Sequence, residues 1–246
     1  IDSKIFDGTK ILDRILFSKS DGNFFDIFEK LNSKITINFN TIYITNEDYL
    51  TNFKADMIVN NNQIKDLILS SQFATKEDLK LSIKTNSNNE RITDLFAGNA
   101  KPLVKKYDFI KGFEGGYLKF DSIEKNKVSN SNLKIFDFKL KDVPALTKLL
   151  TLASLQGIAD LLTGEGIRFN EFEMIFNNKA GLMTIEEIYS LGPSISILMD
   201  GYIQKDDLVS LRGTLVPATT VNKVIGSIPL IGDILVGKKA GEGVFG

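Results

Sequence analysis

Residues 232–246 read GDILVGKKAGEGVFG. The spacing of glycine and lysine residues in this stretch is similar to that of two nucleotide-binding motifs. Gly232, Gly237 and Lys238 match a phosphate-binding loop, in which backbone amides of small residues surround the phosphates and a Ser or Thr after the lysine holds magnesium. Here Asp233 would repel phosphate, and Lys239 stands in the Ser/Thr position. The pattern therefore lacks what phosphate binding requires.

Gly241, Gly243 and Gly246 match the dinucleotide pattern G-x-G-x-x-G. That pattern works when a helix follows the glycines, so that its N-terminus faces the pyrophosphate, with an acidic residue about 20 positions further on. The sequence provides neither after Gly246. We expect these glycines to end a helix and turn the chain.

Catalytic and metal-binding side chains are also scarce. The chain has no cysteine and no histidine, which excludes disulfides, thiolate zinc sites, Cys or Ser-His nucleophiles and imidazole acid-base chemistry. The carboxylate pairs Glu186-Glu187 and Asp206-Asp207 are adjacent, so within strands their side chains would point to opposite faces and share neither a proton nor a metal. We expect no catalytic residue, no metal and no cofactor, and hence no enzyme.

Composition indicates a folded protein without a strongly charged partner. The 246 residues are 43% hydrophobic, and 30 basic against 31 acidic side chains give a formal net charge of -1, which argues against nucleic acid binding. The sequence begins at Ile1 without a signal-peptide pattern, so we expect a segment of a longer protein.

Alternation with a period of two residues dominates the chain and predicts strands. It occurs at Ile35–Phe39, Phe53–Val59, Leu79–Ile83, Leu118–Phe120, Leu133–Leu140, Ile167–Phe176, Ile195–Met199 and Val209–Leu215. The apolar phase slips by one residue after Ile135 and after Phe169, which predicts a β-bulge or a strand break at each place. Short polar stretches, Asn60–Asn62, Ser129–Asn132, Asn177–Gly181 and Lys205–Asp207, predict hairpin connections. The result is a long antiparallel meander with one apolar face.

Helical patterns are fewer. A short helix is expected near 21–31, another begins at Pro102, and a buried helix is expected over 144–162, where apolar residues extend beyond one stripe. A helical pair is expected over 218–236. Asn222, Lys223, Pro229 and Asp233 interrupt the apolar run there, which argues against a transmembrane helix.

Several stretches taken together resemble a known family. LTGEGIRF (162–169), GPSISILMDGYI (192–203), LRGTLVPA (211–218), VNKVIGSIPLIGDIL (221–235) and GEGVFG (241–246), in this order and spacing, resemble the AsmA-like C-terminal region of Gram-negative envelope proteins, the AsmA/TamB type of bridge-like lipid-transfer protein. The resemblance covers residues 101–246. It divides the chain into 1–100, a β-groove repeat segment, and 101–246, the AsmA-like region.

The resemblance implies a periplasmic protein anchored in the inner membrane by a helix outside this segment. It further implies an open β-groove that carries phospholipid toward the outer membrane, capped by apolar helices near the C-terminus, with no catalytic motif. An alternative is a structural or outer-membrane assembly module, which caps a longer groove and docks an envelope protein through residues 218–236.

The alternation gives a physical basis for a lipid path. A sheet with one apolar face must cover it with another sheet, helices or a hydrophobic guest, and the expected helices are too few to cover it all. We expect the early strands, far from the 144–162 helix, to line the path, although each residue could equally be ordinary core. The candidate lipid-binding residues are Phe39, Phe53, Met57, Leu81, Ile83, Phe120, Phe138, Phe169, Met174, Phe176, Ile197, Met199 and Leu211.

Overall fold

A computed structural model describes residues 1–9, 30–106, 110–141, 143, 166–193, 195–204 and 208–217. The predicted helices at 144–162 and 218–236 lie outside these residues, as does nearly all of the one at 21–31. The helix predicted to begin at Pro102 is confirmed as α2 (Lys101–Lys106), which buries Pro102, Leu103 and Val104.

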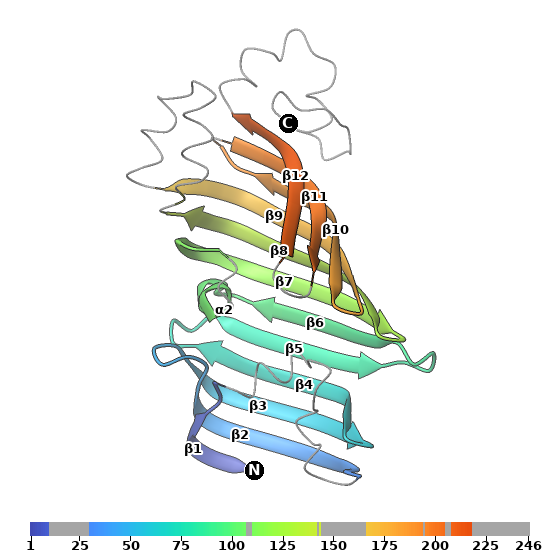
Figure 1. Cartoon of the computed structure of the whole chain (residues 1–246). Helices are drawn as coiled ribbons and strands as arrows, with labels where there is room; N and C mark the ends of the chain where they lie inside the picture. Colours follow the sequence, from blue (N-terminus) through green and yellow to red (C-terminus); the bar gives the residue numbers. More distant parts are fainter. Residues whose placement is uncertain are drawn as a thin grey trace. The chain divides into compact units, whose positions relative to one another are not determined.

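The described residues are mostly strand and form one open sheet in which the strands follow one another in sequence order from β1 to β12 (Figure 1). The strands are β1 (Asp2–Asp7), β2 (Ser33–Tyr43), β3 (Tyr49–Asn60), β4 (Gln63–Phe73), β5 (Asp78–Thr85), β6 (Arg91–Ala97), β7 (Phe113–Lys125), β8 (Val128–Leu140), β9 (Ile167–Lys179), β10 (Leu182–Leu191), β11 (Ile195–Gln204) and β12 (Leu208–Pro217).

The predicted antiparallel meander is confirmed for the strand pairs whose register is known, with the exception of the first strand. From β2 to β7 and from β9 to β12, neighbouring strands pair antiparallel. In contrast, β1 pairs parallel to β2, with Asp2 opposite Asn38 and Phe6 opposite Ile42. Residues 8–32 join these two strands, a connection long enough for the crossover that a parallel pair requires.

The chain divides into two compact units. Unit 1 comprises Ile1–Asp108 and Tyr117–Ser131, and unit 2 comprises Phe109–Gly116 and Asn132–Gly246. The division predicted at residue 100 rests on the resemblance and stays a prediction.

Unit 1 has one buried apolar face and one polar face, as the alternation predicts. Cross-strand partners share a face of an antiparallel pair. Met57 lies opposite Leu67 and Leu67 opposite Ile83, and each is at most 5% exposed. On the other face, Lys54 lies opposite Ser70 and Ser70 opposite Lys80, and all three are exposed.

Tight turns connect the hairpins, and one of them lies elsewhere than predicted. Asn61 and Asn62, with φ of 48° and 62°, join β3 to β4 as expected. Ser129–Asn132 does not form a turn but lies within β8, because the turn is made by Asn126 and Lys127, both with positive φ. Instead, the hydroxyl of Ser131 donates to the Ser122 oxygen across the strands at 2.8 Å.

A bulge reorients β8 in unit 2. Asp137 has φ of 53°, so Ile135 and Phe138, three residues apart, are both buried. Gly116 on β7 accommodates them, since a Cβ there would lie 2.9 Å from the Cβ of Phe138 and 3.5 Å from Cγ2 of Ile135. The slip predicted after Ile135 is thus confirmed, and it lets Phe113, Phe138 and Phe169 stack across three strands with centroid separations of 5.1 and 5.3 Å.

Candidate apolar binding face

The structure brings part of the predicted lining together on one side of β9 to β12. Three rows of cross-strand partners define it: Phe172–Ser190–Ile197–Leu215, Met174–Ile188–Met199–Gly213 and Phe176–Ile185–Gly201–Leu211. We call this surface the β9–β12 apolar face. It contains the predicted residues Met174, Phe176, Ile197, Met199 and Leu211.

Exposure on this face increases toward the edge strand β12. Ile185 and Ile188 on β10 are 3% and 6% exposed. Met174 and Phe176 on β9, and Ile197 and Met199 on β11, are half-buried, while Leu211 on β12 is 42% exposed. Because large apolar side chains reach solvent side by side over several strands, the face can accept a hydrophobic guest.

Two glycines shape the surface of this face. A Cβ on Gly213 would lie 2.3 Å from Cγ of Met199, so the methionine side chain occupies the space above the glycine. A Cβ on Gly201 would lie 2.1 Å from the carbonyl oxygen of Ser210. The glycines let β11 and β12 approach closely. The Met199 side chain fills the space that a Cβ at Gly213 would take, and a methionine side chain adapts to irregular partners.

The predicted lining residues in the early strands lie elsewhere and are closed to solvent. Phe39, Phe53, Met57, Leu81 and Ile83 belong to unit 1 and are 0% to 5% exposed. This reverses the expectation that the early strands offer the more open surface. The physical reason is that alternation reports which side of a strand is apolar and not how fully that side is covered.

The remaining predicted residues are divided between the units. Phe120 lies opposite Leu95 in unit 1 and is half-buried. Phe138 and Phe169 in unit 2 are 2% and 1% exposed and stack on each other. Phe138 and Phe169 therefore act as packed core.

Sequence reasoning missed several members of the face, chiefly those on β10. The run Leu182–Leu191 has apolar residues at Ile185 and Ile188, which are out of phase for a simple strand. A register shift between these residues corrects the phase, so both lie on the same side. The signal was the pair Glu186-Glu187 between two isoleucines, a pattern that fits a bulge carrying its charges away from the apolar side.

The chemistry available on the face is limited to apolar contact, because none of the three rows contains an ionisable residue. The ion pairs nearby join residues in other rows: Lys134 with Glu173 at 3.0 Å, and Arg212 with Asp200 at 3.0 Å. Among the described residues no group of three or more acidic side chains could hold a metal ion.

One titratable group on the polar side of β10 departs from its ordinary behaviour. Burial, helped by the negative charge of Glu171, raises the pKa of the Tyr189 phenol. Tyr189 lies opposite Glu173 and Leu198 and therefore not in the rows of the apolar face. Burial and the charge of Glu171 both favour the neutral phenol.

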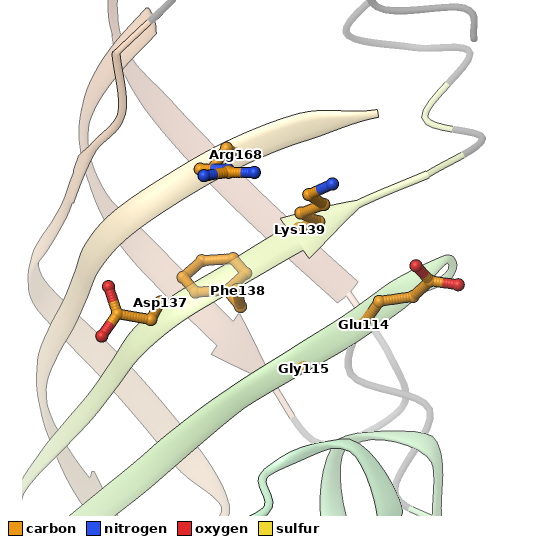
Figure 2. A pocket seen from close by; sticks show the side chains of 6 residues that line it. All are labelled: Glu114, Gly115, Asp137, Phe138, Lys139 and Arg168. Carbon is orange, nitrogen blue, oxygen red and sulfur yellow. The ribbon is translucent and has the colours of Figure 1, made fainter. Parts of the chain in front are cut away.

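A separate hollow of about 390 Å³ lies in unit 2 (Figure 2). Its lining residues are Glu114, Gly115, Asp137, Phe138, Lys139 and Arg168. Lys139 alternates with the buried Phe138 and Leu140, and Arg168 with the buried Ile167 and Phe169, so both cations belong to the polar side. This mixed-charge hollow does not extend the β9–β12 apolar face.

Two further findings complete the description. In the part of the chain that the structure covers, no helix has the length and hydropathy to span a membrane. No family model, no curated protein and no solved structure matches this chain.

Proposed function

We propose that the chain binds the acyl chains of phospholipid along the β9–β12 apolar face and passes them on without catalysis. The observation that carries this proposal is an apolar surface over four strands that contains no ionisable group and reaches solvent on β9, β11 and β12. Such a surface stabilises hydrocarbon wherever it makes contact and imposes little orientation on it.

The energetic argument concerns the barrier to moving a lipid through water. Each methylene removed from water contributes about 0.8 kcal/mol, so a sixteen-carbon chain exposed to water would cost roughly 12 kcal/mol. A continuous apolar lining removes most of that cost. Affinity at any one position can be low, because transfer requires release as well as binding.

The wider setting of the proposal comes from the resemblance to AsmA-like proteins. In that setting the sheet curves into an open β-groove of a periplasmic protein anchored in the inner membrane, and phospholipid travels toward the outer membrane. The β9–β12 apolar face would then be the open part of the path.

A second candidate, a structural module that caps a groove and docks an envelope protein through residues 218–236, is favoured by one observation. Most of the predicted lining in unit 1 is at most 5% exposed and offers no surface to a guest. Deletion of residues 218–236 should abolish recovery of the partner and leave lipid binding intact if both roles exist.

The experiment introduces a carboxylate on each side of one strand. Ile197 lies on the apolar face, whereas Tyr202 lies opposite Ser210 on the other side and is 40% exposed. We expect Ile197→Asp to lower the phospholipid that co-purifies with the chain, measured by native mass spectrometry and solvent extraction, because the carboxylate must stay hydrated. Tyr202→Asp should retain the wild-type amount.

Tyr202 is a better control than Ser196, which lies opposite the buried Val216. Ile197 is half-buried, so Ile197→Asp should also lower the urea midpoint, and the lipid content of the two variants is compared under conditions in which both remain folded. A wild-type chain without lipid, or equal lipid loss in the two variants, would defeat the assignment.

A further inference from the structure

Among the described residues, β12 is the last strand of the sheet and forms one of its edges. It pairs with β11 over its whole length, from Leu208 opposite Gln204 to Pro217 opposite Ile195. Within the described residues no strand follows it in the sheet order. Leu208, Val209 and Leu211 are 54%, 53% and 42% exposed, so apolar side chains reach solvent along an edge that no other described strand pairs with.

The edge also lacks the charges that usually prevent strand addition. Arg212 is the only charged residue in LVSLRGTLVP, and its Nε donates to both carboxylate oxygens of Asp200 on β11, at 3.2 and 3.0 Å. Its charge is therefore compensated within the sheet. The opposite edge strand, β1, is short and carries Asp2, Lys4 and Asp7 within its sequence DSKIFD.

We propose that two copies of this chain pair through β12, antiparallel, about a two-fold axis near residues 210–211. The strand is complementary to itself there. In an antiparallel pair, two residues directly opposite one another have their side chains on the same face of the sheet. The two-fold axis must therefore place residues opposite one another whose side chains point to the same face. Leu211 then lies opposite Leu211 or opposite Val209 of the second copy, and apolar contacts form on one side.

Electrostatics agree with this arrangement. With the axis at Leu211, Arg212 lies opposite Ser210 of the second copy; with the axis at Ser210, it lies opposite Leu208. In neither case do the two arginines face each other, so the pair escapes the like-charge repulsion that would oppose it. Pairing also satisfies backbone N–H and C=O groups along the edge with partners of the same kind.

Pairing has a structural consequence for the β9–β12 apolar face. Each face is most exposed at its β12 border, and the two borders would meet in the dimer. The two faces would then form one continuous apolar surface across both copies. The inference concerns the edge of the sheet and does not depend on lipid binding.

Single cysteines test the proposal cleanly, because the chain has no cysteine of its own. Cross-strand Cα atoms lie about 4.5–5.5 Å apart, within reach of a disulfide. Under mild oxidation of the full chain, Leu211→Cys should form a disulfide-linked dimer if the axis lies at Leu211, and Ser210→Cys should form one if it lies at Ser210, so one of the two variants should cross-link. Ile5→Cys on β1, 67% exposed, is the control and should cross-link far more slowly.

A charge variant tests the same edge without chemical linkage. Ser210→Lys places its ammonium opposite Arg212 or a second lysine, and should weaken the dimer at least about tenfold in sedimentation equilibrium. Ser210→Thr should leave it unchanged.

Several results would overturn the proposal. One is a wild-type chain that sediments as a monomer at every concentration at which it stays soluble, with no cross-link at residue 210 or 211. Another is cross-linking at residue 5 as fast as at the faster of residues 210 and 211, which would mean that the edges associate without selectivity.

Discussion

The apolar sides of the two units are built alike and covered differently. Each contains a stack of phenylalanines across three strands: Phe6, Phe39 and Phe53 in unit 1, and Phe113, Phe138 and Phe169 in unit 2. In unit 1 the side chains of Leu67 and Ile83 are fully buried, at 0% exposure each. In unit 2 the same pattern ends in half-exposed methionines and an exposed Leu211 on β12.

A similar alternation of apolar and polar residues therefore has a different role in each unit. In unit 1 it supports a packed core, whose stability depends on every side chain. On the β9–β12 apolar face, where Met199 lies over Gly213, it supports a surface that tolerates changes in side chain and could adapt to a guest. The following predictions test that distinction.

The largest effect should come from truncating matched leucines in the two units. Leu67→Ala removes a fully buried side chain and should lower the free energy of unfolding by about 2–5 kcal/mol. Leu211→Ala, at a side chain that is 42% exposed, should change it by no more than about 0.5 kcal/mol. Urea unfolding measures both, and similar losses would show that the β12 side is as tightly packed as unit 1.

A smaller effect should separate two adjacent glycines of β7. Gly115 and Gly116 have φ of 72° and 76°, so alanine is strained at either position. A Cβ at Gly116 would also lie 2.9 Å from the Phe138 Cβ, whereas at Gly115 the nearest atom is 3.6 Å away. Gly115→Ala should cost about 1 kcal/mol and Gly116→Ala about 1–3 kcal/mol more. Equal costs in urea unfolding would argue against the close packing of Phe138.

A third test compares methionine with a stiffer residue on the open face. Met199→Ile keeps the apolar character and should leave the urea midpoint nearly unchanged, within about 1.5 kcal/mol. It should narrow the range of acyl chains recovered by solvent extraction, because a β-branched side chain adapts less well. An unchanged lipid profile would mean that Met199 does not shape the surface.

The smallest effects should appear in the response to pH, with opposite signs in the two units. In unit 1, hydrogen bonds from Lys105 and Lys80 hold the pKa values of Glu47 and Asp78 below their ordinary values. Groups with a lowered pKa stabilise the folded state above that range, and this contribution is lost as the pH falls below about 4. Acid should therefore weaken unit 1 slightly.

In unit 2 the pKa of Tyr189 is raised by burial and by Glu171. A raised phenol pKa stabilises the folded state below about pH 10, and this contribution is lost as the pH rises further. Lys105→Gln should reduce the acid response and Tyr189→Phe the alkaline one, measured as urea midpoints across pH. Variants with unchanged responses would contradict these assignments.

Much of the fold could be predicted from the sequence, because alternation is a local property of the chain. Ile35, Ile37 and Phe39 identify β2 without knowledge of its neighbours, and the slip after Ile135 identifies the bulge at Asp137. The strands β1, β4, β6 and β10 were not predicted. In β10 the apolar phase is broken at Glu186-Glu187 and restored only by a register shift against its neighbours.

The candidate site was predictable in part. The sequence predicted that Met174, Ile197 and Met199 lie on the apolar side of their strands. It did not predict that they share a surface with Ile185 and Ile188. It also assigned the open surface to the early strands. How fully an apolar face is buried depends on residues distant in sequence, so a local pattern of residues does not predict it.

The most direct test of the central claim is whether hydrocarbon touches the β9–β12 apolar face. Met199→Cys and Tyr202→Cys, on opposite sides of β11, can each carry an environment-sensitive fluorophore in this cysteine-free chain. Phospholipid with brominated acyl chains should quench the label at position 199 and leave that at position 202 largely unaffected. Equal quenching at the two positions, or none at 199, would contradict the account.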